Sequence, residues 1–196
     1  MIRLLLFSIF ILSFSHSFSQ NFKAGALAGV STSQVSGDQM GGFNKAGLKI
    51  GAFVNHPINL ASRGQLSMYY IDKGSNDVKS QFKIDLSYLE TAWSIQKTSK
   101  GFIYEGGVLF GVLINGKTYD IYGYEDRYKE DFYKFDIGAK ISAGIRMKPK
   151  LFMFWELSNT LPFFPIQEHP GGTTHLLNKG KYNSVLSFSF RYLFSE

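Results

Sequence analysis

The sequence lacks cysteine entirely and has little proline. It contains no Cys and 5 Pro in 196 residues, against 20 Gly and 32 aromatic residues (19 Phe, 11 Tyr and 2 Trp). The absence of Cys excludes a disulfide framework and a lipid-modified cysteine at a processed N-terminus. Many aromatic residues and glycines with few prolines favour numerous strands joined by tight turns over helices. The composition therefore predicts an all-β fold that is stabilised without cross-links.

The N-terminus carries a predominantly apolar run. Arg3 precedes an apolar stretch over residues 4–14, and the small residues Ser17 and Ser19 follow it. A run of about 11 residues is short for a membrane-spanning helix, which needs roughly 20. The pattern predicts a secretory signal peptide at residues 1–19 that is cleaved, followed by one domain at residues 20–196.

Charges of one sign do not cluster in the sequence. The chain carries 21 Lys and Arg against 15 Asp and Glu, and loss of Arg3 with the signal peptide leaves 20 minus 15, or +5. The basic residues are dispersed, and an exported chain does not meet nucleic acid in the cell. We therefore expect no nucleic-acid partner.

Beyond residue 20 the hydrophobic pattern has a period of two rather than a helical period. From Phe135 to Met147 every odd-numbered residue is apolar, while the even-numbered ones include Asp136, Lys140 and Arg146. In residues 82–96 the apolar side chains change from even-numbered to odd-numbered positions near Leu89, which predicts a β-bulge there. Similar alternation predicts eight strands, over residues 22–31, 46–55, 66–70, 82–96, 102–114, 135–147, 151–159 and 181–194.

The connections between these strands differ in length in a regular way. Those after strands one, three, five and seven are long, and those after two, four and six are short. This regularity is typical of an eight-stranded antiparallel up-and-down transmembrane β-barrel in an outer membrane, with both termini in the periplasm. A secreted soluble barrel or sandwich is the alternative.

In a membrane barrel the apolar face of each strand meets lipid and the polar face lines the interior. Ile141 should therefore face lipid, and Lys140 the interior. We expect Glu105 to pair with Arg146, and Arg191 with Glu90, because unpaired charges in a narrow barrel are costly. The expected interior charge network has a structural role and comprises Lys49, Asp85, Glu90, Glu105, Asp136, Lys140, Arg146, Glu156 and Arg191.

The last strand alternates aromatic residues up to Phe194. Such a C-terminal strand is typical of substrates of the barrel-assembly machinery, which we expect as a partner together with outer-membrane lipid. Trp93, Trp155, Tyr182 and Tyr192 are candidates for the aromatic girdles at the two membrane surfaces.

Five segments together resemble a known family. KAGLKIGAFVNHPI, QLSMYYIDKGS, DLSYLETAWSIQ, YEGGVLFGVLING and YKFDIGAKISAGI, in this order and spacing, are similar to the PorT-like outer-membrane β-barrel family of Gram-negative bacteria. The resemblance covers nearly all of the chain after residue 20. It implies a small outer-membrane barrel, and a few members of the family are associated with a protein-secretion system.

Catalysis is the rival function to consider, because some eight-stranded barrels are surface lipid-modifying hydrolases. The candidate residues are Glu168, His169, Thr173, Thr174 and His175, in a loop rich in Gly and Pro. A loop of this kind is poorly suited to hold the three side chains of a catalytic triad in a fixed arrangement. We therefore expect no catalytic residues, and we expect no cofactor and no metal site.

The expected function is a non-catalytic scaffold, binding or secretion-accessory role. A loop rich in tyrosine could bind a glycan or a protein partner, such as a secretion-system component or another surface protein, through amphipathic rings. The alternative is that these tyrosines only extend the strands above the membrane. The candidate residues of this loop are Tyr119, Tyr122, Tyr124 and Tyr128.

Overall fold

The computed structural model describes residues 22–38, 40–79, 81–125, 132–168 and 179–195, and the expected signal peptide lies outside them. No described segment is a helix long and apolar enough to cross a membrane. The described residues form the strands β1 (Lys23–Ser36), β2 (Lys45–Pro57), β3 (Ser62–Asn76), β4 (Lys83–Ser99), β5 (Phe102–Tyr119), β6 (Phe135–Lys148), β7 (Leu151–Thr160), β8 (Gln167–Glu168) and β9 (Gly180–Leu193).

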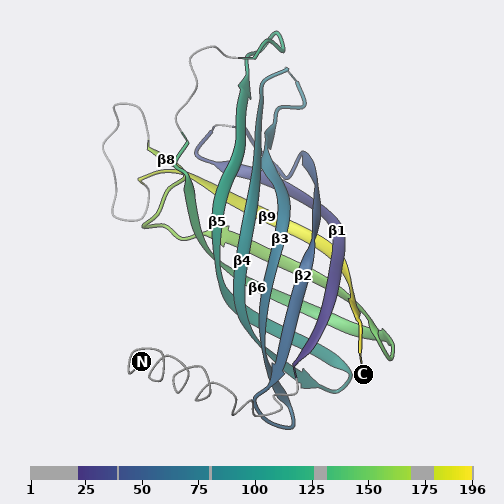
Figure 1. The fold of residues 1–196 in the computed structure, drawn as a ribbon. Helices are drawn as coiled ribbons and strands as arrows, with labels where there is room; N and C mark the ends of the chain where they lie inside the picture. The colour runs from purple at the N-terminus through teal and green to yellow at the C-terminus, as the bar shows by residue number, and fades with distance from the viewer. Residues whose placement is uncertain (1–21, 39, 80, 126–131, 169–178, 196) are drawn as a thin grey trace, which may run out of the picture.

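Eight long strands close into a barrel (Figure 1). Each pairs antiparallel with the next long strand along the chain, and β1 pairs with β9 through a register that includes Ala28 opposite Phe190. The two-residue β8 pairs only with the beginning of β9. The eight-stranded up-and-down barrel predicted from the alternation is confirmed.

The two ends of the barrel differ in their connections. At one end, the turn end, lie the connections 58–61, 100–101 and 149–150, together with the beginning of β1 and the end of β9. Lys100 and Gly101 both have positive φ values, 50° and 85°, as a two-residue type I′ hairpin turn requires. At the other, the loop end, lie the longer connections, of which the structure describes residues 37–38, 40–44, 77–79, 81–82, 120–125, 132–134, 161–168 and 179 (Figure 1).

The apolar faces of the strands point outward. Ile141 is 64% exposed and Trp93 56% exposed, whereas their neighbours Lys140 and Ser94 are buried in the interior. Similar exposed apolar residues on every long strand form a continuous outer belt. This is the facing expected for a barrel surrounded by lipid.

The alternation in β4 continues without a phase change, so the predicted bulge in this strand is wrong. Ile84, Leu86 and Tyr88 are as buried as Glu90 further along the strand. What changes along the strand is the lining of the barrel interior, which is apolar near the loop end and polar nearer the turn end. Beyond the outer belt water covers the outside of the barrel, so apolar side chains pack inside instead. A register irregularity does occur opposite, in β5, where Ser87 pairs with Asn115 and Tyr88 with Leu113.

Candidate functional site

Among the described residues, eight charged side chains in the polar interior are almost completely buried, and we call them the interior ion network. Each is at most 3% exposed, and each lies on the inward face of its strand. Four are cations and four are anions, so their charges cancel. The network comprises Lys49, Lys73, Lys140 and Arg191 with Glu90, Glu105, Asp136 and Glu156.

The half of the network nearer the turn end is built around two glutamates. Lys140 Nζ lies 2.6 Å from Glu105 Oε1 and 3.0 Å from Glu156 Oε2. Arg191 Nη1 lies 2.6 Å from Glu105 Oε2, and Lys49 Nζ lies 2.5 Å from Glu156 Oε1. Each glutamate therefore contacts at least two cations, which balances the desolvation of its carboxylate.

The half nearer the loop end is built around one lysine. Lys73 forms ion pairs with Glu90 and with Asp136, whose Oδ2 lies 2.9 Å from Lys73 Nζ. Asp136 also accepts hydrogen bonds from Thr160 Oγ1 at 2.7 Å and from Asn183 Nδ2 at 2.9 Å. The carboxylate of Asp136 is thus held by donors from three strands.

Aromatic rings support three of the four cations, in positions where the ring quadrupole attracts positive charge. Lys49 Nζ lies 4.2 Å from the centroid of Tyr69, Lys73 Nζ 4.9 Å from that of Tyr88, and Arg191 Cζ 3.7 Å from that of Phe154.

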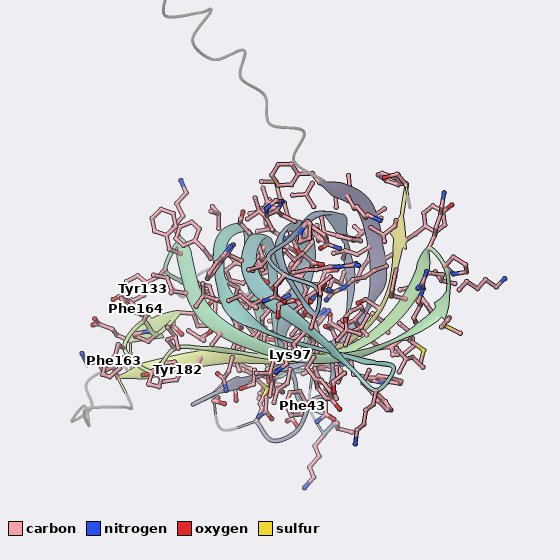
Figure 2. The ribbon with its side chains drawn as sticks, turned by 90° about the horizontal axis from the view of Figure 1, so that it is seen from below. Phe43, Lys97, Tyr133, Phe163, Phe164 and Tyr182 are labelled. Atoms are coloured by element: carbon pink, nitrogen blue, oxygen red, sulfur yellow. The ribbon has the colours of Figure 1, made fainter. Side chains whose placement is uncertain are left out.

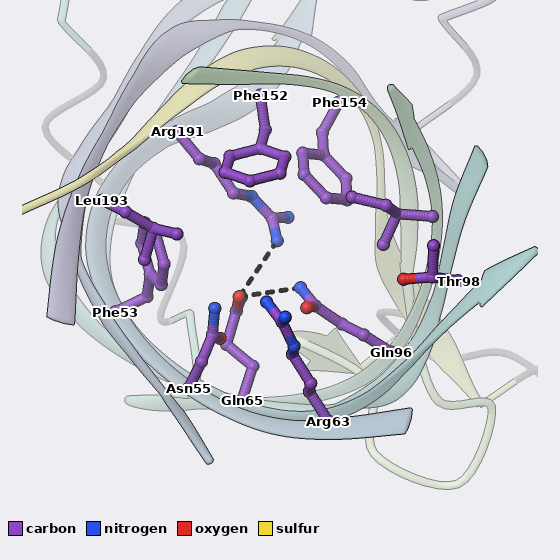
Figure 3. Close-up of a pocket in the computed structure, with 11 residues that line it drawn as sticks. Phe53, Asn55, Arg63, Gln65, Gln96, Thr98, Phe152, Phe154, Arg191 and Leu193 are labelled. Atoms are coloured by element: carbon purple, nitrogen blue, oxygen red, sulfur yellow. Dashed lines mark hydrogen bonds between the residues drawn. The ribbon is translucent and has the colours of Figure 1, made fainter. Parts of the chain in front are cut away.

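A layer of amides closes the network toward the turn end (Figure 3). Gln96 Nε2 donates to Gln65 Oε1 and to Glu105 Oε2, both at 2.8 Å, and Gln65 donates to Ser67. The cavity beside this layer has a volume of about 20 Å³, which is room for about one water molecule. The interior is therefore packed by paired side chains, and every carboxylate of the network has a cation within ion-pair distance.

Two of the expected interior charges lie elsewhere. Asp85 alternates with the buried Ile84 and Leu86, so its side chain points outward, where it pairs with Lys45 at 2.5 Å and Lys83 at 2.6 Å. Partial burial raises the pKa of Asp85, but hydrogen bonds and charge from the two lysines outweigh it and hold the pKa below its usual value.

Arg146 is also outside the network. It is exposed at the turn end, where its Nη2 donates to the carbonyl oxygen of Pro149 at 2.9 Å. The expected Glu105–Arg146 pair is wrong because the β5–β6 register places Glu105 opposite Ser142, further into the barrel.

The expected Arg191–Glu90 pair is wrong as well. Arg191 contacts Glu105 and lies 3.6 Å from Glu156, while Glu90 pairs with Lys73. Lys73 is the network residue that the sequence analysis missed, because the third strand was expected to end at Tyr70. The alternation Tyr69, Ile71, Lys73 carries the signal, since all three are buried.

Three of the four tyrosine candidates are among the described residues, and they lie at the loop end. Tyr119 is the last residue of β5, and Tyr122 and Tyr124 are 71% and 73% exposed in a turn whose backbone N–H groups donate to Asp120. Tyr128 lies outside the described residues.

A groove that the sequence analysis missed lies at the loop end, and we call it the aromatic groove. It has a volume of about 650 Å³. Figure 2 shows Tyr133, Phe163 and Phe164 gathered at one edge of the barrel, near Tyr182. Tyr182 Oη fixes the adjoining loop by donating to the carbonyl oxygen of Pro162 at 2.9 Å. The groove is lined by Tyr133, Lys134, Phe135, Ile137, Phe163, Phe164, Pro165, Glu168 and Lys179.

Most of the catalytic candidates fall outside the described residues: His169, Thr173, Thr174 and His175. Glu168 is described, lies in β8, and raises the pKa of Tyr133 by accepting a hydrogen bond from it. Among the described residues no group of three or more His, Cys, Asp or Glu side chains is placed to hold a metal ion.

Comparisons with known proteins identify the fold. The chain matches no family model, and no curated protein matches it. Ail, the attachment invasion locus protein of Yersinia pestis, was solved in complex with the heparin analogue sucrose octasulfate. Its structure is similar with a TM-score of 0.51 and 11% identity, over 88% of this chain and 99% of that one.

Neisserial surface protein A is similar with a TM-score of 0.50 and 13% identity, over 87% of this chain and 96% of that one. Both are eight-stranded transmembrane barrels. Together with the outward apolar belt, these similarities show that the chain is an all-β, eight-stranded antiparallel transmembrane barrel.

Proposed function

We propose that this chain is an integral protein of a bacterial outer membrane and that it acts without catalysis, as a scaffold that presents a binding surface at its loop end. The observation that carries the proposal is the interior ion network. Four cations and four anions contact one another inside the barrel. Side chains that pair with one another inside the barrel form a structural plug. A functional surface is then expected on the outside of the barrel or on its loops.

A plugged interior predicts that the barrel does not conduct. An open water-filled path would require these charges to face solvent, and they are at most 3% exposed. In planar bilayers the refolded protein should show no stable channel events, in contrast to a porin measured in parallel. A reproducible single-channel conductance in the wild-type protein would contradict the plug.

The aromatic groove is the surface that we assign to a partner. Aromatic rings supply a large contact area, and Lys134, Lys179 and Glu168 provide polar contacts beside them. Two of its rings, Phe163 and Phe164, are 53% and 48% exposed. A secretion-system component or another surface protein fits such a groove better than a small hydrophilic solute.

A sulfated ligand of the kind bound by Ail is less suited to the described loop end of this chain. Seven cations and seven anions balance there: Lys45, Lys79, Lys83, Lys117, Lys134, Lys179 and Lys181 against Asp38, Asp72, Asp77, Asp85, Asp120, Glu125 and Glu168. Polyanion binding draws on an excess of positive charge. We therefore favour a partner recognised through the rings of the aromatic groove.

Insertion and orientation are testable together, because the native chain has no cysteine. We propose that the loop end faces the outside of the cell and the turn end the periplasm. Single substitutions Tyr122→Cys and Lys100→Cys place a thiol at the loop end and at the turn end, respectively. A membrane-impermeant maleimide on intact cells should label only the first, and permeabilised cells should show labelling of both.

The same cells test insertion and the absence of catalysis. The protein should remain in urea-washed outer membranes and migrate differently on a gel before and after boiling. A lipid-modifying hydrolase would change the lipid A mass spectrum, so we expect identical spectra from cells with and without the protein. A difference in lipid A would replace the scaffold role by an enzymatic one.

A further inference from the structure

The charged residues outside the interior are distributed unequally between the two ends. The described segments that build the turn end, residues 22–27, 53–66, 93–104, 143–153 and 190–195, contain no Asp or Glu, and Glu196 lies outside the described residues. Apart from the interior Arg191 they contain seven cations, which we call the basic collar. It comprises Lys23, Arg63, Lys97, Lys100, Arg146, Lys148 and Lys150.

The cations of the basic collar have no carboxylate partner among the described residues. The nearest interior acid, Glu105, is already paired with Lys140 and Arg191. Arg146 and Lys150 donate only to backbone carbonyls, those of Pro149 and Phe194. Among the described residues, the positive charge of the turn end is therefore uncompensated, whereas the charges of the described part of the loop end balance.

Three of these cations line a cavity in the mouth of the barrel, which we call the vestibule. It has a volume of about 390 Å³, and Lys23, Arg63 and Arg146 stand around it. Figure 3 shows Arg63 reaching from the barrel wall toward the lumen beside Gln65 and Gln96. The remaining lining is Thr98, Gly101, Ile103, Pro149, Phe152 and Leu193.

The position of the vestibule limits what can enter it. Its lining comes from β1, β3, β4, β5, β6, β7 and β9 and from two of the turns, so it opens along the barrel axis and not toward the outer belt. A lipid headgroup would have to leave the bilayer surface to reach it. The Gln65–Gln96 hydrogen bond closes its inner end, so an entering group stops there.

We infer that the vestibule and the basic collar bind an acidic peptide segment of a soluble partner. The planar guanidinium groups of Arg63 and Arg146 match carboxylates, and Lys23 adds a third positive charge. Apolar contacts from Ile103, Phe152 and Leu193 suit the stems of glutamate side chains. The four collar cations outside the vestibule extend the site for a segment with several acids. This site lies at the opposite end from the aromatic groove and does not depend on the role proposed for it.

The test uses a fluorescent hexaglutamate peptide and the refolded chain in zwitterionic micelles at low ionic strength. The triple variant Lys23→Gln, Arg63→Gln, Arg146→Gln should weaken binding by about tenfold or more in fluorescence anisotropy. A matched triple variant at the loop end, Lys79→Gln, Lys83→Gln, Lys117→Gln, removes the same net charge and should change the affinity less than about twofold. Heat-modifiable migration confirms that both variants are folded.

Three outcomes would overturn the inference. One is the absence of measurable binding to the wild-type protein, and another is equal weakening in the two triple variants, which would mean attraction by net charge alone. The third comes from nanodiscs that contain phosphatidylcholine and phosphatidylglycerol. Selective retention of phosphatidylglycerol that only the vestibule variant loses, without peptide binding, would assign these cations to lipid headgroups.

Discussion

Glu105 and Arg191 meet across the lumen, with Glu105 Oε2 2.6 Å from Arg191 Nη1, although their strands are not neighbours in the barrel. Glu105 lies on β5 and Arg191 on β9, with β6 and β7 between them. The side chains of both are at most 3% exposed. This contact ties opposite walls together inside a low-dielectric interior, where geometry determines whether a charge is stabilising.

The first prediction concerns this pair. Glu105→Gln alone leaves the network with one excess positive charge, and Arg191→Met alone leaves one excess negative charge, so each should cost about 3 to 5 kcal/mol. The double variant restores neutrality and should cost less than the sum of the two. Unfolding in urea from lipid vesicles measures all three proteins.

The control for this cycle combines Glu105→Gln with Asp85→Asn. Asp85 lies at the other end of the barrel and shares no ion-pair partner with Glu105 among the described residues, so these losses should add within about 0.5 kcal/mol. If Glu105→Gln and Arg191→Met are equally additive, the ion pair does not couple the two walls.

The second prediction tests whether the cost of a charged residue on the outer belt depends on its depth in the bilayer. Ile141 is the central member of the seven outward residues between Phe135 and Met147 on β6, and Met147 is the last of them, at the turn end. Ile141→Lys should cost about 2 to 4 kcal/mol, and Met147→Lys about 0 to 1 kcal/mol, because a lysine near the interface reaches water. The free energy of folding into vesicles measures both. Equal costs for the two variants would mean that the belt does not follow the depth of the bilayer.

The third prediction uses the two tryptophans, which are the only ones in the chain. Trp93 and Trp155 are 56% and 46% exposed on the outer belt. Lipids with brominated acyl chains should therefore quench most of the emission, and aqueous acrylamide should quench little. Trp93→Phe and Trp155→Phe leave one reporter each, on different sides of the barrel. Strong acrylamide quenching of either single-tryptophan protein would place that residue in water.

The sequence predicted the barrel because its strongest signal is local. Ile141 and Lys140 are adjacent, and successive side chains on a strand point to opposite faces whatever the rest of the chain does. The same rule assigned Glu105, Glu156 and Arg191 to the inward face. The alternation and the lengths of the connections are sufficient to predict which side chains point inward and which point outward.

Partners across the lumen could not be predicted in the same way. The contact of Glu105 with Lys140 and Arg191 depends on the tilt and stagger of eight strands, which alternation does not specify. Asp85 was misplaced because the rule that polar faces point inward ends where the strands leave the lipid. The aromatic groove joins residues 133–137 to residues 163–168 and 179, and no local pattern indicates that contact.

The last prediction concerns Asp85, whose ion pairs with Lys45 and Lys83 lie beyond the outer belt. Its pKa in the folded protein is held below the ordinary value, so folding favours the ionised carboxylate. The stabilisation should be fully present above the unfolded pKa of about 3.9 and should disappear as the pH falls through the lower folded value. Asp85→Asn should therefore cost about 0.2 to 1 kcal/mol at pH 7, and the difference from the wild-type protein should begin to narrow near pH 4 and close once the pH lies below the folded pKa. Because the group is partly exposed, high salt should also reduce the difference at pH 7. Urea unfolding at pH 7 and pH 3 measures the change, and a difference that persists unaltered at pH 3 would mean that the two lysines do not stabilise the ionised form.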